Sequence, residues 1–451
     1  MDKTKFISNL DELIQKSCEI ENELFEKNNV KRGLRNQDHT GVLVGLTNIG
    51  DVVGYEKKND TLNPIPGKLI YRGIDVEEIS ENCMKENRHG FDETIYLLLT
   101  GKLPNKSELE FFTEYLSSLR ELPAPFVNNM ITLRGENIMN VLARSVLILY
   151  TYDQNPEDLS LRNLVEQSLS LIAKFPTIIA YAYHSRRHAY HRKTLSIRHP
   201  QLEMSTAENF LYMLKGPDKY TKLEADLLDL SLVLHAEHGG GNNSTFTMRV
   251  TSSSRTDTYS AVSSAIASLK GPLHGGANLK VLDMMENIKE NIKDWSSEKE
   301  MKEYLNKMLK KEVYDKSGKI YGIGHAIYTL SDPRALLLKQ HAKALAIEKD
   351  KYEEFHLYEL LEELAPIAFS EFKGSSSNKL VCANVDLYSG FVYSCIGIKK
   401  ELYTPLFAMS RIAGWCAHRI EELTFSSRRI IRPAYKNVYS RQPYISLDDR
   451  D

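Results

Sequence analysis

Apolar residues recur along this chain mainly at intervals of three and four, the spacing that lines one face of an α-helix. In residues 222–238, for example, Leu223, Leu227, Leu230 and Leu234 follow one another at intervals of three or four. We predict helices over the segments 205–216, 222–238, 257–271, 332–345 and 401–423. Strand signals are few, and residues 41–58 are predicted to form a small hairpin or an extended segment. The pattern as a whole predicts an all-α protein with little sheet.

Local signals mark the start of two of these helices. Ser205 and Glu208 have the spacing of a capping box, which satisfies free N–H groups at a helix start. Asp332 is a favoured N-cap, and Pro333 follows at the first helical position, where no N–H is needed. Gly216 ends the first of the two helices.

No repeat of fixed period and no low-complexity linker divides the chain. Residues 372–379, "FKGSSSNK", form the one loop expected to be flexible. Gly271–Gly276 and Ser389-Gly390 are candidate hinges, so two helical domains are expected. The predicted division is a large domain of residues 1–278 and 390–451 and a smaller domain of residues 279–389.

Composition narrows the class of protein. The 451 residues are 42% hydrophobic and 26% charged, with a net charge of −2, so no general attraction to nucleic acid or anionic membrane is expected. The five cysteines lack CxxC spacing, which favours reduced thiols in the cytoplasm. The N-terminus has no signal-peptide pattern, and the most apolar stretch, 171–183, is interrupted by Lys174 and Pro176. A soluble cytoplasmic protein is expected.

Several histidines stand in glycine-rich surroundings. His235 and His238 are three apart at the predicted end of a helix, in "LHAEHGGGN". Capping of the helix C-terminus is the first interpretation and a ligand site the second. Metal binding ranks third, because His-Ala-Glu-His lacks the four-residue separation of a zinc-protease motif. No metal site is predicted.

Two further histidines, His274 and His325, are adjacent to glycines in the chain. His274 lies in a turn between Gly271-Pro272 and Gly275-Gly276, where it is either without a role or a proton donor to a ligand. In "GIGH", Gly322 and Gly324 precede His325 and allow the backbone to approach a ligand closely. The segment is not a dinucleotide fingerprint, since a preceding strand and a third glycine are missing.

Charged residues at unusual positions are further candidates. Arg334 stands at the second position of its helix, where it opposes the helix dipole, so it is either solvated or part of an anion site. Arg411 falls on an apolar stripe and must meet a buried acid or an anionic ligand. Asp386 is either an N-cap or a carboxylate base. Arg432 lies in an extended tail. A basic patch over 184–200 fits a solvated loop, a phosphorylated ligand or nucleic acid.

Four motifs, "LHAEHGGGN", "GPLHGGAN", "GIGHAIY…DPR" and "NVDLYSG", occur in this order. Together with flanking segments through most of the chain they resemble the citrate synthase family, bacterial-type members nearest, which includes 2-methylcitrate synthase. The resemblance implies an all-α homodimer whose smaller domain closes over the active site. It also implies the tricarboxylic acid cycle reaction in which acetyl-CoA, oxaloacetate and water give citrate and CoA. The coenzyme A thioester is then a substrate, and no separate cofactor is expected.

The resemblance implies a role for each matching residue. Asp386 matches the base that removes a proton from the acetyl-CoA methyl group, His274 the donor to the thioester oxygen, and His325 the donor to the oxaloacetate ketone. Gly322 and Gly324 are candidate CoA contacts. The matching oxaloacetate ligands are His238, Arg334, Arg411 and, from the partner subunit, Arg432.

Two departures and three alternatives remain. The segment Ile320-Tyr321-Gly322-Ile323 before His325 differs from the family's usual Pro-Gly or Gly-Phe pattern. Thr329 stands where family members have an arginine or lysine that contacts CoA phosphate, and Arg35 or the patch at Arg186–Arg192 are candidate substitutes. The alternatives are a 2-methylcitrate synthase using propionyl-CoA, a non-catalytic relative that binds CoA or acids, and a metal-dependent hydrolase using His235 and His238. The expected partners are small molecules, with neither nucleic acid nor membrane.

Overall fold

The computed structural model describes residues 2–36, 38, 40–58, 61–374 and 380–450. It forms two compact units, Met1–Asn48 and Ile49–Asp451. The first unit contains α1 (Lys3–Cys18), α2 (Asn22–Lys27) and the 3₁₀ turn η1 (Arg32–Leu34), none of which has a buried residue. Residues 375–379 of the loop expected to be flexible lie outside the described residues. The division into domains at 278 and 390 stays a prediction.

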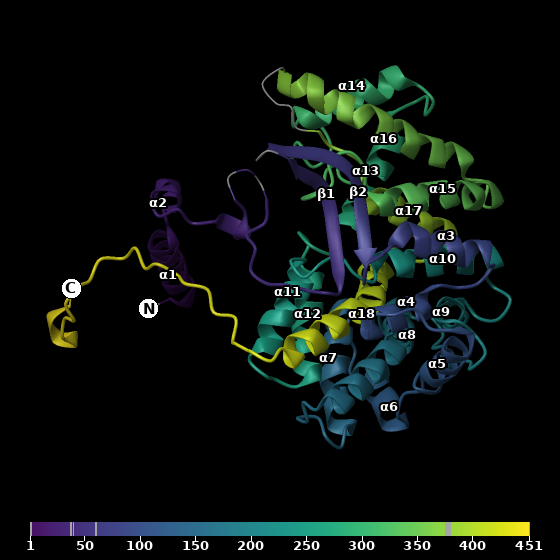
Figure 1. Ribbon diagram of the computed structural model, residues 1–451. Helices are drawn as coiled ribbons and strands as arrows, with labels where there is room; N and C mark the ends of the chain where they lie inside the picture. Colours follow the sequence, from purple (N-terminus) through teal and green to yellow (C-terminus); the bar gives the residue numbers. More distant parts are fainter. Residues whose placement is uncertain (1, 37, 39, 59–60, 375–379, 451) are drawn as a thin grey trace. The chain divides into compact units, whose positions relative to one another are not determined.

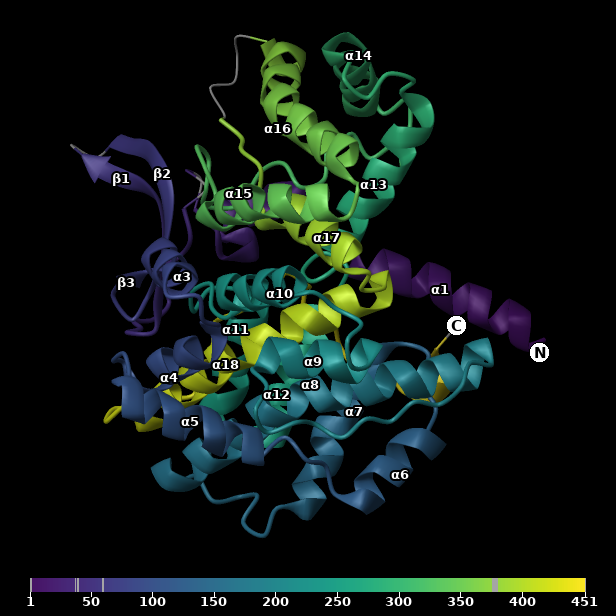
Figure 2. The same ribbon diagram turned by 90° about the vertical axis from the view of Figure 1, so that its right-hand side faces the viewer.

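The second unit is built almost entirely of helices, which confirms the predicted all-α fold (Figures 1 and 2). Its α-helices are α3 (Val76–Lys85), α4 (Phe91–Thr100), α5 (Lys106–Ser118), α6 (Ala124–Thr132), α7 (Ile138–Leu149), α8 (Leu161–His191), α9 (Thr206–Lys215), α10 (Lys222–His235), α11 (Asn243–Ser253), α12 (Thr258–Lys270), α13 (Ala277–Asn291), α14 (Glu298–Leu309), α15 (Pro333–Glu348), α16 (Tyr352–Lys373), α17 (Val385–Ile396) and α18 (Tyr403–Thr424). Shorter 3₁₀ turns are η2 (Tyr150–Tyr152), η4 (Lys400–Leu402) and η5 (Leu447–Asp449).

One three-stranded antiparallel sheet accompanies the helices in the order β1 (Gly50–Lys58), β2 (Thr61–Tyr71), β3 (Ile74–Asp75). The prediction for 41–58 was therefore only partly right: its second half is one strand, and the partner strand follows it. Pro64 and Pro66 lie within β2, and prolines argue against a strand when only the sequence is read.

The five predicted helices correspond to α9, α10, α12, α15 and α18. Ser205 and Glu208 form the capping box at α9, and Asp332 caps α15 by accepting from Arg334 N–H. The helix predicted over 222–238 ends early, at His235, so His238 lies beyond it.

Helix α18 packs against α4, α8, α10, α11 and α12, and nearly all its residues are buried (Figures 1 and 2). Its buried residues include Arg411, His418 and Arg419 as well as apolar side chains, so α18 lies in the interior although it is not apolar on all sides. Helix α10 is also buried along most of its length and packs against α15 and α17 as well as α18. The elements that carry the candidate site residues therefore meet around α10 and α18.

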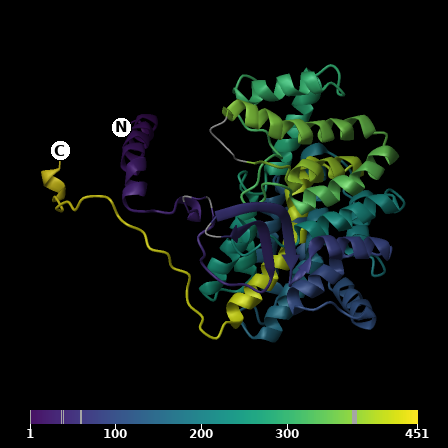
Figure 3. The ribbon, with the colours of Figure 1, turned by 45° about the horizontal axis from the view of Figure 1, so that its top comes forward.

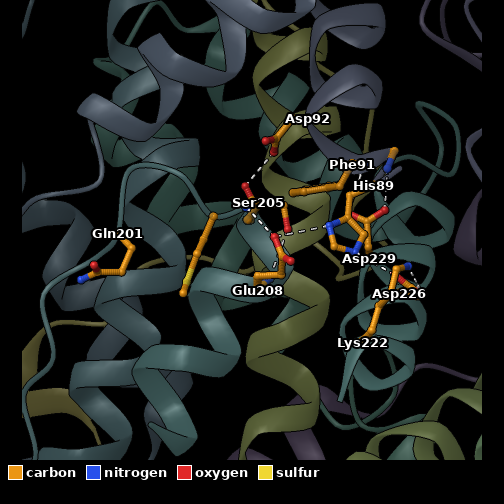
Figure 4. A network of polar contacts seen from close by, with 12 residues as sticks. His89, Phe91, Asp92, Gln201, Ser205, Glu208, Lys222, Asp226 and Asp229 are labelled. Carbon is orange, nitrogen blue, oxygen red and sulfur yellow. Dashed lines mark hydrogen bonds and ion pairs between the residues drawn. The ribbon is translucent and has the colours of Figure 1, made fainter. Parts of the chain in front are cut away.

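A polar network anchors α10 to the start of α4 (Figure 4). The Asp229 carboxylate of α10 accepts hydrogen bonds from the N–H groups of Gly90 (2.6 Å) and Phe91 (3.3 Å). The ring of His89 lies 3.1 Å from Asp226, one turn earlier on α10. Since the first N–H groups of a helix lack partners within it, Asp229 both caps α4 and fixes α10 beside it.

Among the described helices, none combines the length and the apolar character needed to cross a membrane.

Candidate functional site

His274 lies in the turn between α12 and α13. Its Nε2 accepts a hydrogen bond from Ser244 N–H (3.3 Å) and lies 2.9 Å from Ser244 Oγ. This arrangement assigns the ring proton to Nδ1. Burial, reinforced by the charge of Arg411, lowers the pKa of His274 to about 4. At neutral pH the side chain is therefore an uncharged imidazole that can donate from Nδ1.

The glycines that follow His274 have a packing role. A Cβ on Gly275 would clash with the carbonyl oxygen of Leu269, while Gly275 O accepts a hydrogen bond from Thr404 Oγ1 (2.8 Å). The turn can therefore fold back on the end of α12 only with a residue that has no side chain. Close approach of CoA to this backbone stays a prediction.

His325 is held by the backbone that follows it. Its Nδ1 accepts from the N–H groups of Ile327 (3.1 Å) and Tyr328 (3.0 Å), so the proton of the neutral ring lies on Nε2. The ring stacks on Tyr328 with centroids 4.6 Å apart, and the ring of His238 meets it edge-on at 5.2 Å. Two predicted site histidines are therefore neighbours.

The segment before His325 is joined to the start of α17. Asn384 donates from its backbone N–H to Gly322 O and from Nδ2 to Gly324 O, both at 2.8 Å. Gly324 N–H donates to Cys382 O at 2.7 Å. Gly322 and Gly324 have φ values of 81° and 94°, which favour glycine. Their carbonyls bind Asn384, and contact with CoA stays a prediction.

Asp386 is the second residue of α17 and does not cap it. Asn384 is the N-cap, and its Oδ1 accepts from Asp386 N–H at 3.0 Å, so the N-cap interpretation of Asp386 was wrong. Asp386 is half-buried, and its carboxyl group is surrounded by protein. Burial raises the pKa of its carboxyl to about 6, while Arg334 lowers it and Asp332 raises it further.

Arg334 is buried, with 4% of its surface exposed, so the solvated interpretation was wrong. Its Nε and Nη2 donate to the two oxygens of Asp332 at 3.0 and 2.7 Å. Burial disfavours the charge of Arg334, but Asp332 more than offsets this effect and the pKa of the guanidinium is raised. Asp332 Oδ2 also accepts from Val385 N–H (3.2 Å). One carboxylate therefore fixes Arg334 and the start of α17 together.

Arg411 is fully buried and only partly bonded. Its Nε donates to His235 O (2.7 Å), while Nη1 and Nη2 find no partner among the residues described. The guanidinium carbon lies 4.8 Å from the centre of the Phe407 ring, which also contacts the ring of His274 at 6.2 Å. His238 Nε2 is likewise buried without a partner in the described chain. Buried polar atoms without partners call for an explanation, and an anionic ligand would supply acceptors for the guanidinium of Arg411.

Of His235 and His238, only His235 lies at the C-terminus of a helix, which was the first interpretation of this pair. His235 is the last residue of α10, and its Nδ1 donates to Ser231 O (2.7 Å) within the core. Burial lowers the pKa of His235 to about 3. His238 instead lies in the following turn, beside His325. In the described residues no group of three or more His, Cys, Asp or Glu side chains could hold a metal ion.

In a cluster around Tyr328, the tyrosine ring contacts the rings of His238 and His325 and lies 5.8 Å from the guanidinium carbon of Arg334, which interacts electrostatically with Asp386. Phe407 contacts both Arg411 and His274. Arg432 is exposed in the segment that leaves the end of α18 (Figure 3), and within the described chain no hydrogen bond or ion pair joins it to this cluster.

The sequence reading missed the residues that hold the site in place. Asp332 was identified as a cap, but its bond to Arg334 two residues later was not foreseen, although aspartate and arginine at this spacing can meet at a helix start. Asn384 and Ser244 carried no signal beyond that of ordinary helix-start residues. The patch at 184–200 is not simply a loop, since α8 runs to His191 and Arg186 pairs with Glu401 at 2.9 Å.

The chain is similar to known proteins over most of its length. A family model described as "Citrate synthase, C-terminal domain" matches residues 38–434. The citrate synthase of Deinococcus radiodurans is 36% identical over 397 residues, which cover 88% of this chain and 96% of that protein. 2-Methylcitrate synthase 1 of Corynebacterium glutamicum is 32% identical over 422 residues, which cover 92% of this chain and 97% of that protein.

Solved structures agree. The citrate synthase of Thermotoga maritima superposes with a TM-score of 0.71 at 33% identity, covering 94% of this chain and 99% of that one. A ternary complex of carboxymethyl coenzyme A and oxaloacetate with the citrate synthase of Thermoplasma acidophilum gives a TM-score of 0.75 at 26% identity, covering 93% and 99%.

Proposed function

The chain belongs to the citrate synthase family, and we propose that it condenses acetyl-CoA with oxaloacetate and water to give citrate and CoA. The observation that carries this proposal is the protonation pattern of the site. Asp386 is a carboxyl with a pKa raised to about 6, and His274 and His325 are neutral rings with their protons assigned to one nitrogen each. Such a set suits removal of a proton from a carbon next to a carbonyl group.

In the first step, Asp386 removes a proton from the methyl group of acetyl-CoA. The carbon acid is weak, so the negative charge that develops on the thioester oxygen must be stabilised as the proton leaves. His274 donates a hydrogen bond from Nδ1 to that oxygen. Because the raised pKa of Asp386 makes it a stronger base, transfer is easier than to an ordinary carboxylate.

In the second step, the enolate carbon attacks the keto carbon of oxaloacetate. His325 donates from Nε2 to the keto oxygen, which becomes the hydroxyl of citryl-CoA. Hydrolysis of the thioester by water then releases citrate and CoA. Arg411, Arg334 and His238 bind the two carboxylates of oxaloacetate. This assignment is supported by Nη1 and Nη2 of Arg411, which are buried and lack partners among the described residues.

The remaining assignments follow from the family. We place Arg432 in the site of the partner subunit of a homodimer, and the residues 279–389 in a smaller domain that closes over the substrates and excludes water. CoA enters as a substrate, and no separate cofactor or metal is required. We assign the enzyme to the cytoplasm and to the tricarboxylic acid cycle.

A second candidate is 2-methylcitrate synthase, which uses propionyl-CoA. The similarity to a Corynebacterium glutamicum protein of that name over 92% of this chain favours it. The residues and steps above are unchanged, since only one methylene is added to the thioester. One methylene changes the binding free energy by only about 1–3 kcal/mol in an apolar pocket, so few residues decide the preference.

Release of free CoA from acetyl-CoA and from propionyl-CoA, each with oxaloacetate, tests the proposal. We expect faster release from acetyl-CoA and a loss of at least about a hundredfold in kcat for Asp386→Ala. Asp283→Asn is the control, because Asp283 is a partly exposed carboxylate that pairs with Lys400 at 3.4 Å.

The outcomes separate the candidates. A preference for propionyl-CoA assigns the chain to 2-methylcitrate synthesis. No release from either thioester would leave the non-catalytic relative as the better account. Full activity in Asp386→Ala would remove this residue from the role of base.

A further inference from the structure

A buried pair, Glu237 and His418, lies next to the site and takes no part in the steps above. Both side chains are fully buried. Glu237 Oε1 accepts hydrogen bonds from His418 Nε2 (2.8 Å) and from the N–H of Gly239 (2.6 Å). Glu237 directly precedes His238, and His418 follows Arg411 by two helical turns on α18. The pair thus joins the two elements that carry proposed oxaloacetate ligands.

Arg249 determines the direction of the hydrogen bond within the pair. Its Nε donates to His418 Nδ1 (3.0 Å), which leaves the proton of His418 on Nε2, facing Glu237. Arg249 is itself paired with Glu422 at 2.8 Å and with Glu421. His418 therefore donates from Nε2 to Glu237, and one oxygen of the carboxylate is held by this bond.

Gly414 lets Glu237 reach α18. A Cβ at this position would lie 2.5 Å from Ala236 O and would clash with Glu237 Oε2. Oε2 is buried and accepts no hydrogen bond from any described residue. A buried carboxylate in this position requires a positive charge nearby, because an isolated buried charge is costly.

Arg411 supplies that charge without bonding to the carboxylate. Its only hydrogen bond among the described residues runs from Nε to His235 O, so Nη1 and Nη2 stay available. Burial lowers the pKa of Arg411 to about 10, and attraction to Glu237 opposes that fall. Glu237 and Arg411 therefore attract one another without a hydrogen bond between them. Glu237 Oε1 and Arg411 Nε form hydrogen bonds with other groups, and Glu237 Oε2 and the Nη atoms of Arg411 have no partner among the described residues.

We propose that Glu237 is a positioning residue that balances the charge of Arg411, while His418 and Gly239 hold its carboxylate away from the guanidinium. The proposal rests on the proposed function in taking oxaloacetate as the anion that Arg411 binds. Glu237 stabilises the empty site, but it also repels the substrate carboxylate. It thereby sets the affinity for oxaloacetate without touching it.

Glu237→Gln separates this role from a merely structural one. The amide oxygen can accept both hydrogen bonds of Oε1, whereas the negative charge is lost. The free enzyme should melt at a lower temperature, because Arg411 loses its counter-charge. Oxaloacetate should bind at least about fivefold more tightly by titration calorimetry, because a repelling charge has been removed. In turnover, KM for oxaloacetate should fall more than kcat changes.

His418→Leu should have the opposite effect on binding. Without its donor, the Glu237 carboxylate is free to reach Nη1 and Nη2 of Arg411 and to compete with the substrate. Oxaloacetate should then bind at least about fivefold more weakly. The double variant of Glu237→Gln and His418→Leu should lose this weakening, since the competing charge is gone.

Glu224→Gln is the matched control. Glu224 is another buried carboxylate of α10, paired with Lys215 (2.7 Å) and Lys349 (2.6 Å). Its loss should lower the melting temperature and leave oxaloacetate affinity unchanged. Weaker or unchanged binding in Glu237→Gln would overturn the proposal, and if that variant does not fold, unchanged binding in His418→Leu would do so.

Calorimetry keeps this test distinct from that of the proposed function. Wild-type protein that binds oxaloacetate but releases no CoA would contradict the reaction and leave the comparison of variants valid. Wild-type protein that binds no oxaloacetate would contradict both.

Discussion

Backbone N–H groups determine the tautomers of two histidines of the site. Ser244 N–H donates to Nε2 of His274, and the N–H groups of Ile327 and Tyr328 donate to Nδ1 of His325. A ring nitrogen that accepts from an amide cannot also carry a proton. The proton of the neutral ring is therefore on Nδ1 in His274 and on Nε2 in His325, the nitrogens that the proposed mechanism uses as donors.

The raised pKa of Asp386 predicts the acid limb of the pH profile. The base must be ionised in the free enzyme, and its carboxyl takes up a proton below about pH 6, whereas an ordinary aspartate would do so near pH 4. We expect kcat/KM for acetyl-CoA to be level above this pH and to fall about tenfold per pH unit well below it. Initial rates in buffers of constant ionic strength provide the measurement.

Activity regained on return to neutral pH is the control for this profile, because it distinguishes protonation from unfolding. A profile that stays level down to about pH 4.5 would show that the base of the free enzyme has an ordinary pKa.

At the scale of elements, the site depends on how α10 is fixed. The Asp229 carboxylate accepts from two N–H groups at the start of α4, and that helix start favours a negative charge. Burial nevertheless raises the pKa of Asp229 to about 7. The contact between Asp229 and the start of α4 is therefore less favourable at neutral pH, where the carboxyl is partly ionised, than in mild acid, where it is protonated.

This difference gives the anchor a pH-dependent contribution to stability. The folded protein holds the proton of Asp229 more tightly than the unfolded chain, so the contribution is complete below about pH 4 and is lost as pH rises through about 7. In Asp229→Asn this dependence is absent. The free energy of unfolding of wild type minus that of the variant should grow as pH falls from about 8 to about 5, by about 3 kcal/mol at most.

Urea unfolding of both proteins at matched pH values measures that difference. Asp226→Asn is a suitable comparison, since Asp226 lies on the same helix and is partly exposed beside Lys222. A difference independent of pH would mean that Asp229 has the same pKa in the folded and unfolded protein.

At the scale of the whole molecule, the proposed homodimer makes a prediction about mixed subunits. If Arg432 completes the neighbouring site, the Arg432→Ala and Asp386→Ala homodimers are each deficient. In a mixed dimer, one of the two sites has both residues intact. Subunits denatured together in equal amounts and refolded should recover roughly a quarter of the wild-type CoA release.

The same variants refolded separately and then combined are the control, and they should show only the sum of their residual rates. Equal rates from the two preparations would argue against a residue shared across the interface.

Helical periodicity and end signals were enough to predict the fold class and five of the helices, because apolar spacing and capping are local properties. The motifs also named site candidates that are far apart in the chain, and the roles of these residues stay predictions. His238, His325, Arg334 and Asp386 are separated by up to 148 positions in the chain, and the structure brings them into one cluster.

The sequence alone therefore determined the helical class, five of the helices and the chemical types available for a site. Only the tertiary structure decided the state of those groups. The bond of Asp332 to Val385 N–H, the lack of a described partner for the Nη groups of Arg411 and the raised pKa of Asp386 depend on which elements pack together. Burial and charge act through space, and neighbours in space are not neighbours in the chain.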